Sequence, residues 1–582
     1  MNETATTVER AAPSVPRVRV AARDLDRRLF LAGVGACTAA VGAFLLVQLS
    51  GWSPHEDETL PLFVGRQPLG SLFDVVLGQR GGAPLHFLLA WIVAHTGGGL
   101  YAMRFLSALF ATASLPAIAA LGNRLAGRGP ALAATALAAA SWMLLFHGIY
   151  ARMYSLFLLL STLSYLALLR ALDRGSGRGW ALWAVVMLLA IGAHPYGALV
   201  LGSQGLYVLL RRDRLRQAAP AFAAVLLLAV PLWRSSVVLA GRLDVGVGGG
   251  GGKLRTPREV LAYLWRVAGD FSSGYVGVLV VVLLFAALGL VRLVRERPRS
   301  GLLAACVVVT PTLFFLVGRF GGNAAPESRH LIFVLPFLVL ATATGIMAAA
   351  RAAGPRGAWL AALLVAALLP AEVAWGWHKT PALFKGENPV RVVSRHRAAD
   401  WLAATSRPDD VLFAYEPLYL AAWKRGGSVV SRTVVPRADP KLALRTLREA
   451  PKPLGRGVWI FDAGDDNNFV KRTRIELRLP FPHSEFEGRV YGPYLIIRTR
   501  RRTVTIARYL VDSHKAEIIG KSLAMGDADI NHQTIKQACS RAVGFSLSLD
   551  QLLEARGVLE GRKPCRGSPP RRPSASGGGQ HR

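Results

Sequence analysis

Long apolar runs dominate the first 376 residues and constrain the fold more than any other feature of the chain. Most of them extend for about 17 to 22 residues with almost no charged side chain. About 20 such residues cross the hydrocarbon core of a bilayer as a helix, which satisfies its own backbone hydrogen bonds. We therefore predict a membrane all-α architecture of about 11 transmembrane helices. The expected spans are 30–50, 105–122, 131–149, 153–172, 180–194, 198–210, 218–236, 276–294, 302–318, 329–350 and 358–376.

The basic residues indicate the orientation of these spans. Arginines gather in the short loops 124–128, 170–178, 211–216, 292–299 and 351–356, which alternate with less basic loops. Short loops rich in Lys and Arg stay in the cytoplasm. We expect a bacterial inner (cytoplasmic) membrane protein with a cytoplasmic basic N-terminus (1–28) and its C-terminal part outside. The net charge of +33 is spread over these loops rather than along one binding stripe, which disfavours a nucleic-acid partner.

Two features of this topology remain open. The runs at 180–194 and 198–210 are short for two crossings, and one kinked span over 180–210 is the alternative. Two crossings keep the arginines of 211–216 inside. The apolar segment 84–94 would invert every later loop if it crossed the membrane, so we expect it to lie at the outer interface.

The composition divides the chain into further parts. The membrane domain covers 29–376, with a first outer loop at 51–104 and a flexible, glycine-rich outer loop at 237–275 that contains an amphipathic helix near 257–268. Strand-like runs at 411–415, 429–435, 458–461 and 494–498 alternate with helical stretches such as 439–449, which predicts a small soluble α/β domain over 377–500. A helical soluble segment is expected at 501–560 and a disordered basic tail at 561–582. The four cysteines show no spacing typical of a metal site or a disulfide framework.

The first outer loop offers an acidic cluster. His55 is followed by Glu56, Asp57 and Glu58, close to the end of the first span. A carboxylate near a low-dielectric interface is costly unless it is solvated or paired. The cluster is either a solvated acidic loop or a set of functional carboxylates.

Cationic and aromatic residues occur at the predicted outer ends of other spans. They are Arg104, Arg152, Tyr154, His194, Arg329 and His330. An arginine fork suits a phosphate oxygen, and a carboxylate can accept a proton from a hydroxyl group. Each residue also has a structural alternative: the arginines and His330 as interfacial anchors, and His194 as a partner for a helix end.

The order of these segments resembles a known family. The segments are Asp57-Glu58, 83–89, 104–110, 150–156 and Arg329-His330 followed by Pro336. Together they are similar to the GT-C glycosyltransferases of family 39, which include protein O-mannosyltransferases and lipid A aminoarabinose transferases. The resemblance covers about residues 28–376.

The resemblance implies a GT-C fold and an enzyme. Family members transfer one sugar from a polyprenyl-phosphate donor to an acceptor lipid, glycan or protein on the extracytoplasmic face, with inversion. It implies that Asp57 is the general base, with Glu58 second. Arg104, Arg152, Arg329 and His330 become candidates for binding the donor phosphate. His55, His86, Tyr154 and His194 become candidates for binding substrate. We expect no cofactor and no metal, although the carboxylates at 56–58 could hold a divalent ion.

The chain departs from the family pattern at two positions. Ala83 replaces the first of two common prolines, and His86 stands where relatives often carry an aromatic or basic side chain. Nothing in the C-terminal part identifies the acceptor or the sugar. A transporter or flippase of lipid-linked sugars is the alternative from another class, and a membrane-anchored domain that binds envelope components is a third. The transporter is disfavoured because the spans contain almost no ionisable side chain at mid-membrane.

Overall fold

The computed structural model describes residues 15–51, 53–242, 249–254, 256–320, 324–413, 417–426, 433–435, 450, 455–462, 486–492 and 494–500. The chain forms two compact units. The first contains Met1–Trp52 and Leu69–Gly386, and the second contains Ser53–Pro68 and Glu387–Arg582. The segment 53–68, which the sequence analysis assigned to the membrane domain, therefore groups with the C-terminal unit.

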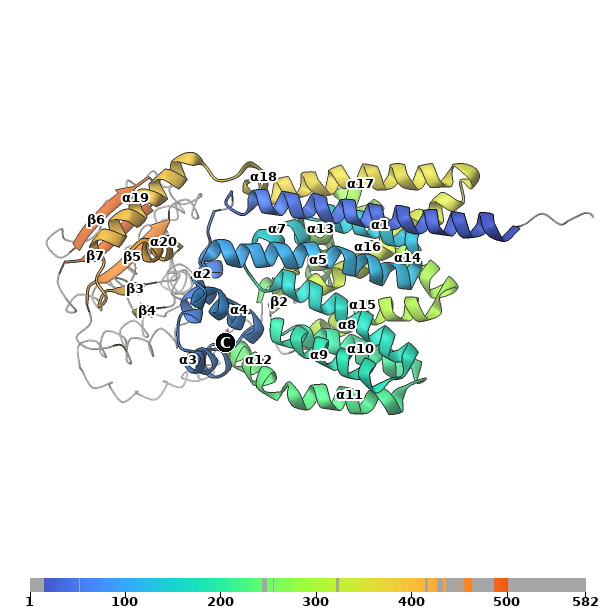
Figure 1. The fold of residues 1–582 in the computed structure, drawn as a ribbon, viewed down its shortest axis with the longest axis horizontal. Coiled ribbons are helices and arrows are strands. Elements are labelled where there is room, and N and C mark those ends of the chain that lie inside the picture. The colour runs from blue at the N-terminus through green and yellow to red at the C-terminus, as the bar shows by residue number, and fades with distance from the viewer. Residues whose placement is uncertain are drawn as a thin grey trace, which may run out of the picture. The chain divides into compact units, whose positions relative to one another are not determined.

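The first unit is a bundle of helices whose long members run side by side with nearly parallel axes (Figure 1). Its helices in chain order are α1 (Val15–Gln48), α3 (Leu69–Phe73), η1 (Asp74–Gln79), α4 (Pro84–His95), α5 (Leu100–Ala126), α6 (Arg128–Ala140), α7 (Trp142–Ile149), α8 (Tyr154–Arg174), α9 (Gly177–Ala193), α10 (Gly197–Arg211), α11 (Leu215–Leu228), α12 (Val230–Arg242), α13 (Pro257–Phe271), α14 (Val276–Glu296), α15 (Pro298–Phe320), η2 (Ser328–Val334), α16 (Leu335–Arg351), η3 (Gly354–Arg356), α17 (Gly357–Lys379) and α18 (Ala382–Lys385).

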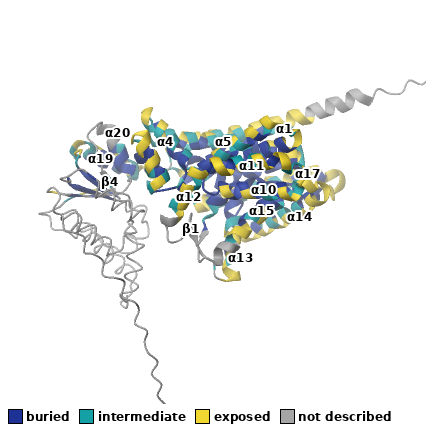
Figure 2. Cartoon of the chain, turned by 90° about the horizontal axis from the view of Figure 1, so that it is seen from below, coloured by how far each residue is buried: buried dark blue, intermediate teal, exposed yellow. Residues whose placement is uncertain are grey.

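Burial separates central from peripheral helices in this bundle. In α8 and in η2–α16, 78% of an 18-residue apolar window is buried, whereas the share is 22% in α14 and in α17 and 17% in α1. Exposed residues follow the outer surface of the bundle and buried residues fill its inside (Figure 2). The exposed side chains of the peripheral helices are largely apolar, as on Val280, Leu284 and Leu288 of α14. A large exposed apolar surface suits contact with lipid rather than water.

The number of crossings stays a prediction. Among the described residues, seven helices are long and apolar enough to span a membrane, or up to nine if the bent pairs α6–α7 and α11–α12 each count once. Each pair is bent by 54°. Helices α9 and α10 have 17 and 15 residues and are too short to count as candidate spans. They are the two predicted spans, at 180–194 and 198–210, that separate nine candidates from the eleven predicted. The chain is a multi-pass membrane protein.

The predicted flexible loop at 237–275 contains more regular structure than the sequence suggested. The glycine run enters strand β1 (Gly249–Lys253), which pairs antiparallel with β2 (Ala324–Pro326). The amphipathic helix expected near 257–268 is present as α13, and it begins with a capping box between Thr256 and Glu259. The strands β1 and β2 lie far apart in sequence, so their pairing could not be predicted from local patterns.

The second unit contains a mixed five-stranded sheet in the order β4-β3-β5-β7-β6. Its strands are β3 (Val411–Phe413), β4 (Thr433–Val435), β5 (Gly457–Asp462), β6 (Phe486–Tyr491) and β7 (Tyr494–Thr499), and its helices are α2 (Glu56–Gly65), α19 (Pro389–Thr405) and α20 (Pro417–Gly426). β3 runs parallel to β4 and β5, and β7 runs antiparallel to β5 and β6. Four of these strands lie in the predicted stretches, and β6 was not predicted.

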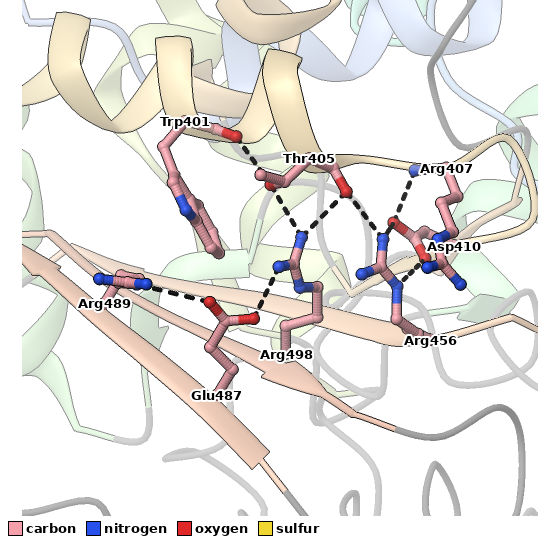
Figure 3. Close-up of polar contacts among 8 residues, drawn as sticks. All are labelled: Trp401, Thr405, Arg407, Asp410, Arg456, Glu487, Arg489 and Arg498. Atoms are coloured by element: carbon pink, nitrogen blue, oxygen red, sulfur yellow. Dashed lines mark hydrogen bonds and ion pairs between the residues drawn. The ribbon is translucent and has the colours of Figure 1, made fainter.

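Arginine side chains join helix α19 to this sheet (Figure 3). Arg456 donates to both carboxylate oxygens of Asp410, at 2.9 Å each, and to the carbonyl of Thr405 at 2.8 Å. Arg498 donates to the same carbonyl at 3.0 Å and to Glu487 at 2.7 Å, and stacks over Trp401. Two cations at the carbonyl end of a helix oppose the negative end of its dipole. The network is therefore a structural clamp.

Some predicted parts lie outside the described residues. They are the helical stretch 439–449, the soluble segment 501–560 and the basic tail 561–582.

Candidate functional site

A cluster of histidine and tyrosine rings lies in the first unit where central helices begin. Tyr154 opens α8, His330 lies in η2, and His194 follows α9. The ring centroid of Tyr154 is 5.7 Å from the ring centroid of His194 and 5.6 Å from that of His330. His194 and His330 are buried, and His194 Nε2 lies 3.0 Å from His330 Nδ1. Three residues that the sequence predicted separately therefore meet.

The turn before Pro195 fixes the geometry of His194. A residue that precedes proline favours extended backbone, and His194 has φ −157° and ψ 139°. Its Nδ1 accepts a hydrogen bond from the amide of Tyr196 at 3.0 Å. In a neutral imidazole the other nitrogen then carries the proton, so Nε2 donates to His330 Nδ1. His194 thus accepts a hydrogen bond from the residue that precedes α10, which matches its alternative role as a partner for a helix end. The bond from His194 also orients the ring of His330, and it does not use the Nε2–H group of His330.

Arg152 and Arg329 border the ring cluster. The guanidinium carbon of Arg329 lies 5.5 Å from the centroid of Tyr154, and its Nε lies 2.7 Å from Glu327 Oε2. Arg152 lies in the four-residue break between α7 and α8. Both guanidinium groups interact electrostatically with His194 and His330. Five of the predicted binding residues, the two arginines among them, thus belong to one electropositive cluster around Tyr154.

His147 belongs to the same cluster, although it was not predicted from the sequence. Its side chain is 0% exposed in α7, and its ring centroid is 4.6 Å from Tyr154. Neither ring nitrogen has a hydrogen-bond partner in the described part of the chain. A buried polar group without a partner is costly and calls for a ligand or a water. A histidine three residues before the motif at 150–156 was the available signal.

His86 also interacts electrostatically with Arg152. It is buried near the start of α4, and its Nε2 has no hydrogen-bond partner among the described residues. Burial, together with the positive charge of Arg152, lowers the pKa of His86 to about 3. The imidazole is neutral at physiological pH, so it can act as a hydrogen-bond donor or acceptor but not as a cation.

The predicted acids lie in the second unit, at the start of α2. Glu58 is 0% exposed, and its carboxylate accepts from the amide of His55 at 3.0 Å. His55 Nδ1 accepts in turn from the amide of Asp57 at 3.1 Å. Glu58 and His55 therefore form a capping box that starts the helix. This arrangement places Asp57 in the first turn and gives Glu58 and His55 a structural task.

Arg104 is buried in the first turns of α5. It donates to the carbonyl of Leu49 at 3.1 Å, at the end of the first span. This bond links α5 to the end of the first span. Its role in binding phosphate stays a prediction.

The chemistry of the cluster suits an anion. Arg329 and three buried imidazoles contact the Tyr154 ring, and Glu327 is an acidic neighbour of Arg329. Arg152 interacts electrostatically with the same imidazoles. Guanidinium and neutral imidazole both donate hydrogen bonds to phosphate oxygens. Within the described ranges, no group of three or more His, Cys, Asp or Glu side chains is placed to hold a metal ion.

Comparison with solved structures finds similar chains from two kinds of protein. ArnT from Cupriavidus metallidurans, solved with bound undecaprenyl phosphate, is 14% identical with a TM-score of 0.48, over 80% of this chain and 97% of that one. An oligosaccharyltransferase from Archaeoglobus fulgidus, in its apo form, is 11% identical with a TM-score of 0.47, over 79% of this chain and 73% of that one. No protein-family model matches the chain, and no curated protein matches it in sequence.

Proposed function

We propose that this protein is a glycosyltransferase that takes one sugar from a polyprenyl-phosphate donor at the extracytoplasmic face of the bacterial inner membrane. The observation that carries the proposal is the meeting of Arg329 and His147 at Tyr154, where the buried central helix α8 begins. Arg152 interacts electrostatically with both of them. A cationic cluster at the end of membrane helices can hold a phosphate while the apolar tail of the same molecule stays among lipids.

The cluster would bind the donor in two ways. Arg152 and Arg329 supply charge for the phosphate, and their planar forks suit its oxygens. His147, whose ring nitrogens have no partner in the described part of the chain, supplies a directional hydrogen bond to the phosphate or to the sugar. His330 adds a second donor, because His194 occupies its Nδ1.

Asp57 is the proposed general base, a role that rests on the resemblance of the first outer loop to the family motif. It removes the proton from an acceptor hydroxyl group as that oxygen attacks the anomeric carbon. The new carbon–oxygen bond forms while the bond from the anomeric carbon to the phosphate oxygen breaks, with inversion. The polyprenyl phosphate leaves with the bonding electrons, and the arginines stabilise its added charge. The acceptor is a lipid, a glycan or a protein.

The phosphate site can be tested with undecaprenyl phosphate as the probe. The full chain in lipid nanodiscs should bind it, and Arg329→Gln or Arg152→Gln should raise the Kd by about tenfold or more, because each removes a charge-assisted hydrogen bond. Arg292→Gln, which removes an exposed guanidinium from α14, is the matched control and should bind like wild type. Equal affinity in all four proteins would remove the basis of the proposal.

A further inference from the structure

A buried carboxylate lies at a junction of four elements beside the cluster. Asp270, near the end of α13, is 5% exposed. Its Oδ2 accepts a hydrogen bond from the Ser328 hydroxyl group at 2.6 Å, and its Oδ1 lies 2.7 Å from the ammonium group of Lys379. Ser328 begins η2, and Lys379 ends α17. One side chain therefore links three segments that lie 50 or more residues apart in sequence.

The Lys379 ammonium group is also held by aromatic rings. It lies 4.7 Å from the ring centroid of Trp142 and 5.7 Å from that of Trp375. Trp142 begins α7, and its indole nitrogen donates to the Thr380 hydroxyl group at 3.1 Å. A cation over two indole faces gains attraction from both rings. The start of α7 is thereby joined to the same ion pair.

A second contact ties α7 to α13. The hydroxyl group of Ser141, the residue before α7, donates to the carbonyl of Phe271 at 3.0 Å, and both residues are buried. Phe271 follows Asp270 directly. The end of α13 therefore holds the start of α7 through Ser141 and the start of η2 through Ser328.

These two elements carry three of the proposed donor-binding side chains. Arg329 and His330 follow Ser328 in η2, and His147 lies in α7, about 1.4 turns from Trp142. A change of about 1 Å in such groups can cost large factors in binding or rate. A hydrogen bond to an ionised carboxylate is also among the stronger ones.

We propose that Asp270 is a positioning residue, which holds Arg329 and His330 in place for the donor phosphate through the hydroxyl group of Ser328. Lys379 neutralises the buried carboxylate and makes this arrangement stable. The inference rests on the proposed function, because it assigns Asp270 and Ser328 to the same lipid-phosphate site.

The test measures binding of undecaprenyl phosphate to the full chain in nanodiscs, at a temperature well below the Tm of every variant. Ser328→Ala cuts the link to η2 and leaves the Asp270–Lys379 ion pair intact, so it should fold. Its Kd should rise by about five- to tenfold. Ser328→Thr keeps a hydroxyl group and should restore most of the affinity. Glu296→Gln breaks exposed ion pairs of α14 with Arg292 and Arg351 and should leave the Kd unchanged.

A double-mutant cycle tests whether Asp270 acts through Ser328. Asp270→Ala should weaken binding at least as much as Ser328→Ala, and the double variant should be no weaker than Asp270→Ala alone. A role in stability alone would lower the Tm of these variants without changing the Kd of the folded protein. Wild-type affinity in Ser328→Ala would overturn the inference while leaving the proposed function in place. Failure of the wild-type chain to bind the lipid phosphate would instead overturn both.

Discussion

The guanidinium carbon of Arg329 lies 5.5 Å from the ring centroid of Tyr154, so a cation from η2 rests on the first aromatic ring of α8. Tyr154 is 1% exposed and also contacts the rings of His147, His194 and His330. The Tyr154 ring therefore contacts one arginine and three histidines of the cluster.

Removing this ring should weaken binding of the lipid phosphate, whereas removing its hydroxyl group should matter less. Tyr154→Phe keeps the face on which Arg329 rests, and we expect its Kd for undecaprenyl phosphate to stay within about threefold of wild type. Tyr154→Leu loses a cation–π contact worth about 1–2 kcal/mol when desolvated, which predicts a Kd about five- to thirtyfold higher. Equal effects of the two substitutions would show that the ring face plays no part.

The acid sensitivity of the protein should depend on His86. Its pKa is about 3 in the folded chain against an ordinary 6.5, so between these values the unfolded state binds a proton that the folded state does not. Stability therefore falls as the pH drops below 6.5, by about 2 kcal/mol between pH 6.5 and 5 for this group alone. The Tm of His86→Gln should fall less steeply over that range.

His95→Gln is the matched control for this profile, because His95 is an exposed residue of the same helix α4. Its Tm should follow the wild-type dependence on pH. If His86→Gln also followed the wild-type curve, His86 would not be the buried neutral group that we describe.

Close contact of α14 with α16 depends on two glycines. A Cβ atom added at Gly345 would meet the carbonyl of Phe285, and one added at Gly289 would meet that of Ala341. Gly345→Ala should therefore lower stability by about 1–3 kcal/mol through overpacking. Gly277→Ala, also in α14, meets no atom within 4 Å and should be neutral or slightly stabilising. Thermal unfolding in detergent compares them, and an unchanged Tm for Gly345→Ala would contradict the close approach.

The arginine clamp of the second unit predicts a large effect at Asp410. Asp410 is fully buried and takes both bonds from Arg456 (Figure 3). Asp410→Asn leaves a buried guanidinium without its counter-charge, at a cost of about 3–5 kcal/mol. Amide hydrogen exchange in α19 and β5 should accelerate by about 100-fold or more. Arg489→Gln, at a side chain that is 57% exposed, should change exchange by only a few-fold.

The sequence predicted the parts of the fold that follow from local patterns. Apolar runs predicted the long helices. The position of polar side chains at the ends of those runs predicted the site residues Arg152, Tyr154, His194, Arg329 and His330. These residues stand out because a charged or polar group beside an apolar run is unusual. Their meeting in the first unit is the main point on which the structure adds to the prediction.

Contacts between distant segments could not be predicted in the same way. His147 lies inside the apolar run 131–149, which was interpreted as one uninterrupted span, whereas the helix breaks at Ser141. The ion pair of Asp270 with Lys379 joins residues that lie more than 100 positions apart, and no local pattern indicates it. The grouping of 53–68 with the C-terminal unit depends on tertiary contacts such as the hydrogen bond from Ser53 to Glu387.

Release of polyprenyl phosphate during sugar transfer tests the proposed function most directly. The purified full chain in nanodiscs would be incubated with a panel of polyprenyl-phosphate sugars and membrane extract as the source of acceptor, and the lipid products would be measured by mass spectrometry. We predict that at least one donor is converted to polyprenyl phosphate, and that Asp57→Asn loses this activity by at least about 100-fold while its Tm and its affinity for undecaprenyl phosphate remain those of wild type. Movement of intact donors across the membrane without cleavage, or full activity of Asp57→Asn, would contradict the proposed transferase mechanism.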